Sequence, residues 1–370
     1  MEPAVAARDL VYVATNDPRP NRNAVLAYRR AEDGTLSQLG AYLTGGTGFA
    51  NPAGIVGPED SDQNVIINEE RTMLFAVNGG SDSIAVFGIA GDGSLSLVPG
   101  APFASSGTQP VSLGLRGTHL YVVHKDQDPT RRGPTTGPGY AVFEVGDGGA
   151  LSARPEMTIS AERGSSPAQA LVSPDGRLLF GAEPFAGTLR SFRIEPGRLD
   201  PQPATPVGAA HPSPVGLAVH PRERILYVGL PTRAEVAVYE YDEQGRLTLV
   251  RTVPNSGRAV CWLITNRDGS RMYTVSNASN SVSVYDTSDP LHPLEVQSVT
   301  LGGVGGAFQE SLDPAGRFLH VVTVNGAGNR PQDNALHVLA VNPDDGPLGA
   351  PRATPLPVPP EAHPAGVACA

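Results

Sequence analysis

Residues 213–250 read S-P-V-G-L-A-V-H-P-R-E-R-I-L-Y-V-G-L-P-T-R-A-E-V-A-V-Y-E-Y-D-E-Q-G-R-L-T-L-V. Four short runs rich in Val, Leu and Tyr stand at 215–219, 225–229, 235–241 and 247–250. Polar, Gly or Pro turns separate these runs, a pattern that is typical of antiparallel strands. Four strands in about 40 residues are too few to bury a core, so the unit must stack on copies of itself.

The rest of the chain contains such copies. The second run of each unit has an aromatic residue after an aliphatic one, replaced once by His. These positions are Tyr12, Phe75, Tyr121, Phe180, Tyr227, Tyr273 and His320. Four of the six steps between them are 46 or 47 residues (121−75, 227−180, 273−227 and 320−273), and the longer steps carry insertions. Seven four-stranded units at this period predict an all-β fold, a seven-bladed β-propeller with antiparallel blades.

The first unit lacks an inner strand near the N-terminus. Residues 363–368 (H-P-A-G-V-A) match 213–218 (S-P-V-G-L-A), so we expect the C-terminal strand to close the ring in the first blade. The chain is then one propeller domain, 1–370. Its blades are expected at about 8–42 plus 363–369, 64–103, 109–156, 167–203, 213–253, 258–301 and 307–350.

Composition narrows the possible partners and location. The chain carries 27 Lys and Arg against 37 Asp and Glu, a net charge of −10, and no basic stripe that would suit a nucleic acid. No apolar run is long enough to span a membrane, and the N-terminus lacks the features of a secretory signal. Cys261 and Cys369 fall on blades that are not neighbours, so we expect two free thiols. We therefore expect a cytoplasmic monomer that binds neither nucleic acid nor membrane.

Long loops indicate the functional face. Insertions at 128–138 and 325–333 lie between second and third strands, and residues 44–63 form a long connection into the second unit. Second-to-third-strand loops lie on the face where the inner strands begin, and long loops gathered on one face usually mark the functional one. We therefore expect a small anionic molecule to bind at the channel mouth on this face.

Polar residues near the strand ends on this face supply the candidate site. Arg258 is expected to bind a substrate carboxylate or phosphate. Glu183, Glu310 or His124 is expected to act as a general acid or base. Four amide side chains complete the predicted substrate-binding set: Gln169, Gln309, Asn277 and Asn78.

Structural roles are the alternative for the same residues. The asparagines would cap turns, Arg258 and Glu310 would neutralise each other, and Trp262 would pack between blades. The chain has no close metal-ligand spacing, no nucleophile elbow and no phosphate loop followed by a predicted helix. We therefore expect neither a metal nor a cofactor.

Three motifs together carry a family resemblance. They are the turn S-P-D-G-R at 173–177 with its variants at 266–270 and 313–317, the strand that follows it, and S-V-S-V-Y at 281–285. They resemble the lactonase family of seven-bladed propellers, which includes 6-phosphogluconolactonase and carboxymuconate cyclase. The resemblance covers nearly the whole chain. It implies hydrolysis, or reversible ring closure, of a small carboxylated or phosphorylated lactone at the central channel mouth.

The residues that the family uses at its site carry over only in part. Where the family has a His-rich start to the fourth inner strand, this chain has residues 166–169 (S-P-A-Q), and Arg-His in the fifth is replaced by residues 215–216 (V-G). The family's Glu in the sixth corresponds to Trp262, while Glu183 corresponds to an acidic family position. Two alternatives therefore stay open, a non-catalytic binding or scaffold propeller and a divergent biosynthetic cyclase.

Overall fold

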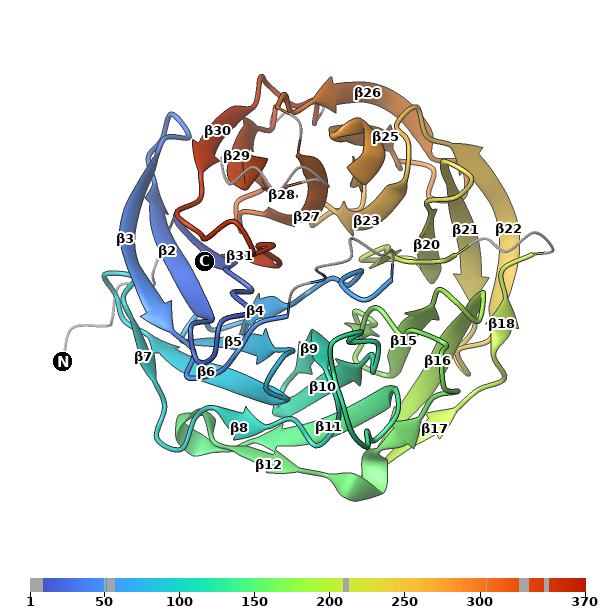
Figure 1. The fold of residues 1–370 in the computed structure, drawn as a ribbon. Coiled ribbons are helices and arrows are strands. Elements are labelled where there is room, and N and C mark those ends of the chain that lie inside the picture. The colour runs from blue at the N-terminus through green and yellow to red at the C-terminus, as the bar shows by residue number, and fades with distance from the viewer. Residues whose placement is uncertain are drawn as a thin grey trace.

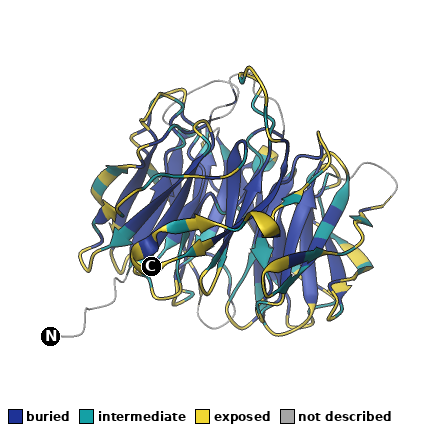
Figure 2. Ribbon diagram, turned by 90° about the horizontal axis from the view of Figure 1, so that it is seen from below, coloured by how far each residue is buried: buried dark blue, intermediate teal, exposed yellow. Residues whose placement is uncertain are grey.

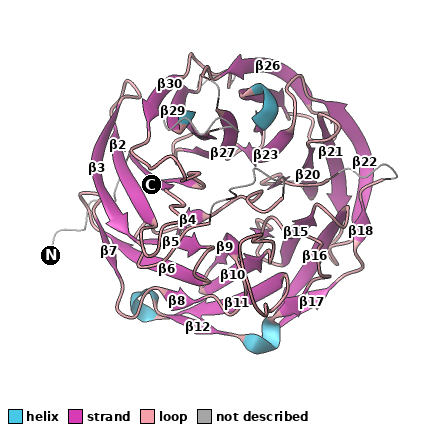
Figure 3. Ribbon diagram, viewed as in Figure 1, coloured by secondary structure: helices cyan, strands magenta, loops and turns pink. Residues whose placement is uncertain are grey.

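The computed structural model describes residues 9–49, 51, 57–208, 213–303, 305–325, 333–342 and 346–370. Over these residues the strands form seven antiparallel sheets arranged around a central axis (Figure 1). The helical segments of the described residues are short 3-10 turns, which include η1 (Asp147–Gly149), η2 (Pro155–Met157) and η3 (Asn277–Ser279) (Figure 3). The prediction of an all-β, seven-bladed propeller is confirmed. Most of the predicted insertion at 325–333 lies outside the described residues.

The blades follow one another in chain order, and the strands of each run from the inner to the outer edge. Blade one comprises β31 (Val367–Cys369), β1 (Leu10–Ala14), β2 (Ala24–Arg30) and β3 (Leu36–Leu43). Blade two comprises β4 (Val65–Ile67), β5 (Met73–Asn78), β6 (Ser83–Ile89), β7 (Leu95–Leu97) and β8 (Phe103–Ala104). Blade three comprises β9 (Pro110–Arg116), β10 (His119–His124), β11 (Gly139–Val145), β12 (Leu151–Ala153) and β13 (Ile159–Ser160). Blade four comprises β14 (Leu171–Val172), β15 (Leu178–Glu183), β16 (Thr188–Glu195), β17 (Arg198–Pro201) and β18 (Thr205–Pro206).

The last three blades each have four strands. Blade five comprises β19 (Leu217–Val219), β20 (Ile225–Leu230), β21 (Glu235–Tyr241) and β22 (Leu247–Pro254). Blade six comprises β23 (Val260–Thr265), β24 (Arg271–Ser276), β25 (Ser281–Asp286) and β26 (Leu294–Thr300). Blade seven comprises β27 (Gly306–Leu312), β28 (Phe318–Val324), β29 (Ala335–Ala340) and β30 (Arg352–Pro355).

The outer strand is interrupted in blades two, three and four, where the sequence predicted one continuous fourth strand. Both pieces pair with the same third strand, as β7 and β8 do with β6. Proline residues stand in the gaps: Pro102 before β8, Pro155 before β13 and Pro203 before β18. Proline has no amide proton to donate, so it breaks the ladder, and an outer strand tolerates this because its other edge is free.

The C-terminal strand closes the ring as predicted. β31 pairs antiparallel with β1, with Val11 opposite Cys369 and Val13 opposite Val367. Reciprocal backbone hydrogen bonds join Leu10 and Ala370 at the end of this pairing (3.2 and 2.9 Å). The first and last segments of the chain therefore share one sheet, and the inner edge of β1 is paired with β31 instead of being exposed.

The second strands form the core because a blade packs on each side of them. These strands are buried, and Figure 2 shows buried residues along the strands of the sheets and exposed residues mostly in the loops and at the periphery. Their tyrosine hydroxyls reach the next blade, as when Tyr227 donates to the carbonyl of Pro290 (2.9 Å). In blade seven the corresponding residue is His320, whose Nδ1 lies 3.3 Å from Sγ of Cys369 on the closing strand. The replacement of the aromatic residue by His thus coincides with the point of ring closure.

Two further sequence-based predictions concern buried residues. Cys261 and Cys369 are both free, as expected. Trp262 is fully buried and packs edge-on against Phe308, with ring centroids 6.2 Å apart, so it has the interblade role rather than a ligand-stacking one. Within the described part of the chain, no helix is long and apolar enough to cross a membrane.

Candidate active site in the central channel

Residues 57–63, which we call the crossing segment, run across the mouth of the central channel before β4 (Figure 1). Side chains from opposite sides of the ring bind its backbone. Gln109, just before β9, donates from Nε2 to the carbonyl of Pro58 (2.9 Å), and Gln309 on β27 donates to the carbonyl of Ser61. The channel is therefore covered on the face that carries the long loops, where the sequence predicted an open mouth.

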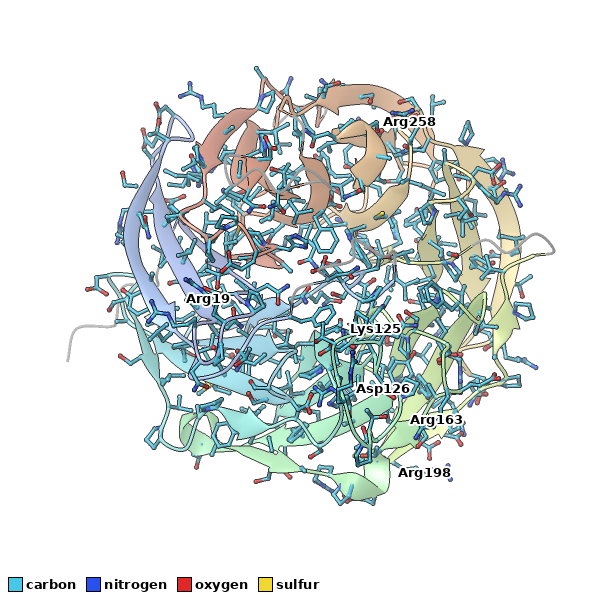
Figure 4. All side chains as sticks on the ribbon, in the orientation of Figure 1. Arg19, Lys125, Asp126, Arg163, Arg198 and Arg258 are labelled. Carbon is cyan, nitrogen blue, oxygen red and sulfur yellow. The ribbon has the colours of Figure 1, made fainter. Side chains whose placement is uncertain are left out.

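Lys125 adds a further attachment. The Nζ of this buried lysine donates to the carbonyls of Asp60 (2.6 Å), Pro167 (3.3 Å) and Ser166 (3.4 Å). Burial lowers the pKa of Lys125 to about 8, and the charge of Asp60 opposes that shift. The lysine therefore fastens the crossing segment to blade four, and Figure 4 shows it near the middle of the ring.

Beneath the crossing segment the channel contains a cavity of about 460 Å³. Among the described residues, six of the seven inner strands contribute to its lining, which is mainly aliphatic. Four larger polar side chains lie at the end nearest the crossing segment: Asp62, Gln63, Gln169 and Glu310. The lining at the other end reaches Pro174 and Pro221 in the turns after β14 and β19, and Pro174 is exposed. The cavity is thus closed at the long-loop face and open at the opposite, short-turn face.

Two carboxyl groups occupy the closed end in different surroundings. Glu310 on β27 is buried, and neither of its carboxylate oxygens has a hydrogen-bond partner among the described residues. Burial raises the pKa of Glu310 well above its usual value, and the charge of Asp62 adds to the rise. Burial raises the pKa of Asp62 to about 7, although a hydrogen bond from the backbone amide of Gln63 (2.8 Å) lowers it. Burial therefore favours the protonated form of Glu310, while Asp62 is near the midpoint of its titration at neutral pH.

Gln169 positions the Asp62 side of this pair. Its Nε2 lies 3.0 Å from Oε1 of Gln63 and 3.4 Å from Oδ2 of Asp62. Its Oε1 accepts from the backbone amide of Leu217 on β19 (2.7 Å). One amide group thus joins blade four, blade five and the crossing segment, which holds the carboxyl group of Asp62 in place.

The structure brings only some of the predicted site residues together. Glu310 and Gln169 line the cavity, and Gln309 lies beside it, bound to Ser61 and to Asn64. Arg258 was expected at the channel mouth, but it is exposed and lies toward the rim in Figure 4, with Nη2 3.4 Å from the carbonyl of Ala278. The reason is that β23 begins only at Val260, so Arg258 still belongs to the connection that returns from the outer strand. Its expected pairing with Glu310 does not form.

His124 and Glu183 are buried between blades. Burial lowers the pKa of His124 to about 4, and its ring packs against Gly107. Burial raises the pKa of Glu183, and Arg190, whose Nη1 is 3.3 Å away, opposes this. Both residues end second strands, whose side chains alternate between the two interblade spaces instead of facing the axis. Of the four residues predicted to converge at one mouth, only Glu310 lines the channel cavity, and His124, Glu183 and Arg258 do not.

The two asparagines have structural roles, but these roles link neighbouring blades, whereas the expected alternative was turn capping. The Oδ1 of Asn78 accepts from Asn23 Nδ2 (2.8 Å) and from Thr44 Oγ1 (2.7 Å), which ties blade two to blade one. Asn277 in η3 donates to the carbonyl of Ala307 (3.1 Å), which ties blade six to blade seven. Their side chains are therefore occupied by neighbouring blades.

A second depression, of about 750 Å³, lies away from the axis between blades five and six. Charged residues line much of it, and they pair locally, as Arg246 does with Asp242 (2.7 Å) and Arg224 does with Glu243 (3.1 Å). It has no buried, unpartnered polar group among its described lining residues, so the channel cavity is the stronger candidate.

The sequence-based prediction missed Asp62. The repeat pattern predicts only a loop at 44–63, although the length of this connection and the acidic residues just before an inner strand were the available signals. Nothing in the pattern places Asp62 opposite Glu310, because the connection has no counterpart in the other units.

Comparisons with known proteins support the fold and the resemblance. Residues 202–352 match the family described as Lactonase, 7-bladed beta-propeller. A search of curated proteins found no match. The structure is similar to a putative 6-phosphogluconolactonase from Bacteroides fragilis, at 16% identity over 99% of both chains with a TM-score of 0.72. It is also similar to a periplasmic gluconolactonase from Pseudomonas aeruginosa, at 18% identity over 97% of this chain and 98% of that one, with a TM-score of 0.71. The predicted resemblance to lactonase propellers is confirmed, while these structural likenesses speak for the fold alone.

Proposed function

We propose, from the match to lactonase propellers, that this protein is a lactonase-like hydrolase whose reaction takes place in the channel cavity. The observation that supports this most is the pair of buried carboxyl groups, Asp62 and Glu310, at the closed end of a largely aliphatic cavity. Burial raises the pKa of both groups, that of Asp62 to about 7, which suits a pair in which one group holds a proton while the other is ionised near neutral pH.

The roles follow from the protonation states. Asp62, as carboxylate, takes a proton from a water molecule whose oxygen attacks the lactone carbonyl carbon. The ring C–O bond breaks, and protonated Glu310 gives its proton to the departing ring oxygen. The product is a hydroxy acid, and solvent returns a proton to Glu310 after Asp62 releases one. Ring closure of the hydroxy acid is the reverse of the same steps.

The cavity favours an uncharged lactone. Among its described lining residues there is no Lys, Arg or His to pair with a carboxylate or phosphate. The small anion expected from the sequence would need Arg258, which lies outside the cavity. If Arg258 does bind such an anion, Arg258→Ala should weaken binding by about 1.5–3 kcal/mol.

The test is a panel of neutral, carboxylated and phosphorylated lactones, followed by proton release, with the reverse reaction assayed on the hydroxy acids. Glu310→Gln and Asp62→Asn should each lower kcat by roughly 10²–10⁴-fold, the usual contribution of a general acid or base. Glu243→Gln, at an exposed turn, is the matched control and should behave as wild type. Full activity of both channel variants would refute the proposed roles.

A binding propeller without catalysis is the second candidate, and the covered long-loop face favours it. In that case wild type and Glu310→Gln would bind the same lactones without turning them over. The two unpaired cysteines are typical of a reducing compartment. A cytoplasmic location is part of the proposal.

A further inference from the structure

The channel cavity has a polar end and an apolar wall. Toward the short-turn face, the wall includes aliphatic side chains that are only half-buried, so part of their apolar surface faces the cavity. They come from three inner strands and are Ile66, Ile67, Leu171, Val172 and Ile264. Binding an apolar ligand against exposed apolar surface in a concave site is favourable, because it removes that surface from water.

The only described route into this cavity is from the short-turn face. The crossing segment covers the other end, held by Gln109, Gln309 and Lys125. A molecule entering past Pro174 and Pro221 meets aliphatic side chains first and the carboxyl groups last. The reacting group of the substrate must therefore enter first, and the rest of the substrate then lies along the inner strands.

We infer that the substrate is a lactone carrying an alkyl chain, which enters from the short-turn face. Its ring reaches Asp62 and Glu310, and its chain lies against Leu171, Val172 and Ile264. This inference rests on the proposed function and specifies its substrate class. It differs from the sequence-based expectation both in the face used and in the charge of the substrate.

The test uses the full chain and a series of butyrolactones with no substituent, a butyl chain or an octyl chain. Values of kcat/KM come from proton release, and binding to wild type and to Glu310→Gln comes from calorimetry. We expect kcat/KM and affinity to rise about three- to fourfold per methylene group, which corresponds to ~0.8 kcal/mol, until the chain outgrows the cavity.

Ile264→Trp narrows the channel near the short-turn face. It should abolish the advantage of the octyl compound over unsubstituted butyrolactone, so that kcat/KM no longer rises with chain length. Val172→Trp tests the same wall from another blade if Ile264→Trp folds poorly, as judged by thermal melting. Leu294→Trp, on the exposed outer strand β26, is the matched control and should leave the series unchanged.

The outcomes separate the two proposals. Turnover that is lost in Glu310→Gln but does not depend on chain length would overturn the alkyl-lactone inference and keep the proposed function. Chain-dependent binding without turnover by wild type would overturn the proposed function and keep the channel specificity. A preference for carboxylated lactones that disappears in Arg258→Ala would also overturn the inference, because the site would then lie at the rim.

Discussion

Asp62 and Glu310 are far apart in the sequence but line the same cavity, and the charge of Asp62 raises the pKa of Glu310. Asp62 belongs to the connection after blade one, whereas Glu310 lies on the inner strand of blade seven. Two carboxyl groups that share a buried site cannot both ionise cheaply, so their protons are lost in steps that belong to the pair. This coupling determines how both stability and activity should depend on pH.

The first prediction is that Asp62→Asn stabilises the protein above neutral pH. The pKa of Asp62 is raised from 3.8 to about 7 in the folded chain, so the unfolded chain ionises first. The free energy of unfolding therefore falls as the pH rises from 3.8 to about 7, and it stays low at higher pH. We expect Asp62→Asn to raise the free energy of unfolding by roughly 2–4 kcal/mol at pH 8, and by progressively less toward pH 5. Urea unfolding measures this, with exposed Glu243→Gln as a control that should show no such trend.

The second prediction concerns the pH profile of the proposed reaction. The reaction requires Asp62 as carboxylate and Glu310 as acid, so kcat/KM should rise through a pKa near 7 and fall at higher pH as Glu310 ionises. Glu310→Gln should lose the falling limb along with most of its rate. A profile that is flat from pH 5 to 9 in wild type would show that this pair does not perform the chemistry.

The third prediction tests ring closure. Removal of residues 363–370 takes away β31, which pairs with β1 and buries Val367 and Ala368 against the neighbouring blades. At about 25 cal/mol per Å² of apolar surface, several kcal/mol of burial is lost and a sheet edge is exposed. The truncated chain should aggregate or melt at a much lower temperature. Cys369→Ser leaves the backbone of β31 in place and should melt close to wild type.

The fourth prediction concerns the two thiols. Burial raises the pKa of both, that of Cys369 to about 12 and that of Cys261 further, so both should react slowly with thiol reagents in the native protein. Cys369 is half-buried and lines the cavity, so it should be labelled before Cys261, and a bound ligand should protect it. Mass spectrometry after labelling measures both rates, and detection of a Cys261–Cys369 bridge would contradict the structure.

The blades could be predicted from the sequence, but most of the site could not. Interblade packing demands the same residue types in each second strand, so Tyr227 and its counterparts form a repeat that can be seen in the sequence. The closing strand could be predicted because residues 363–368 match residues 213–218. The site depends on features outside the repeat. Asp62 reaches the axis only because other blades bind the crossing segment. The expected position of Arg258 is wrong because its inner strand begins at Val260, later than the repeat pattern predicts.

The last prediction tests what holds the crossing segment over the channel. The buried amide of Gln309 donates to the carbonyl of Ser61 and to Oδ1 of Asn64, the residue just after this segment. Gln309→Leu keeps the volume but removes the donor to both acceptors, and Asn64 Oδ1 keeps only the longer bond from Ser61 Oγ (3.3 Å). A buried acceptor left unpaired costs about 1–3 kcal/mol. Because the lost bonds lie at one end of the segment, hydrogen exchange should speed up across residues 57–63 more than elsewhere.

The matched control for Gln309 is Gln297 on the outer strand β26, which bonds the backbone of Leu348 through both ends of its amide (2.9 and 2.6 Å). Gln297→Leu should cost similar stability but leave exchange in residues 57–63 unchanged. If the segment is a fixed cover, neither variant should alter which lactones bind. If Gln309→Leu instead admits bulky or anionic lactones that wild type rejects, the crossing segment is what confines the substrate to the short-turn face. Unchanged exchange in Gln309→Leu would mean that the remaining contacts, those of Gln109 and Lys125, suffice to hold the segment over the channel.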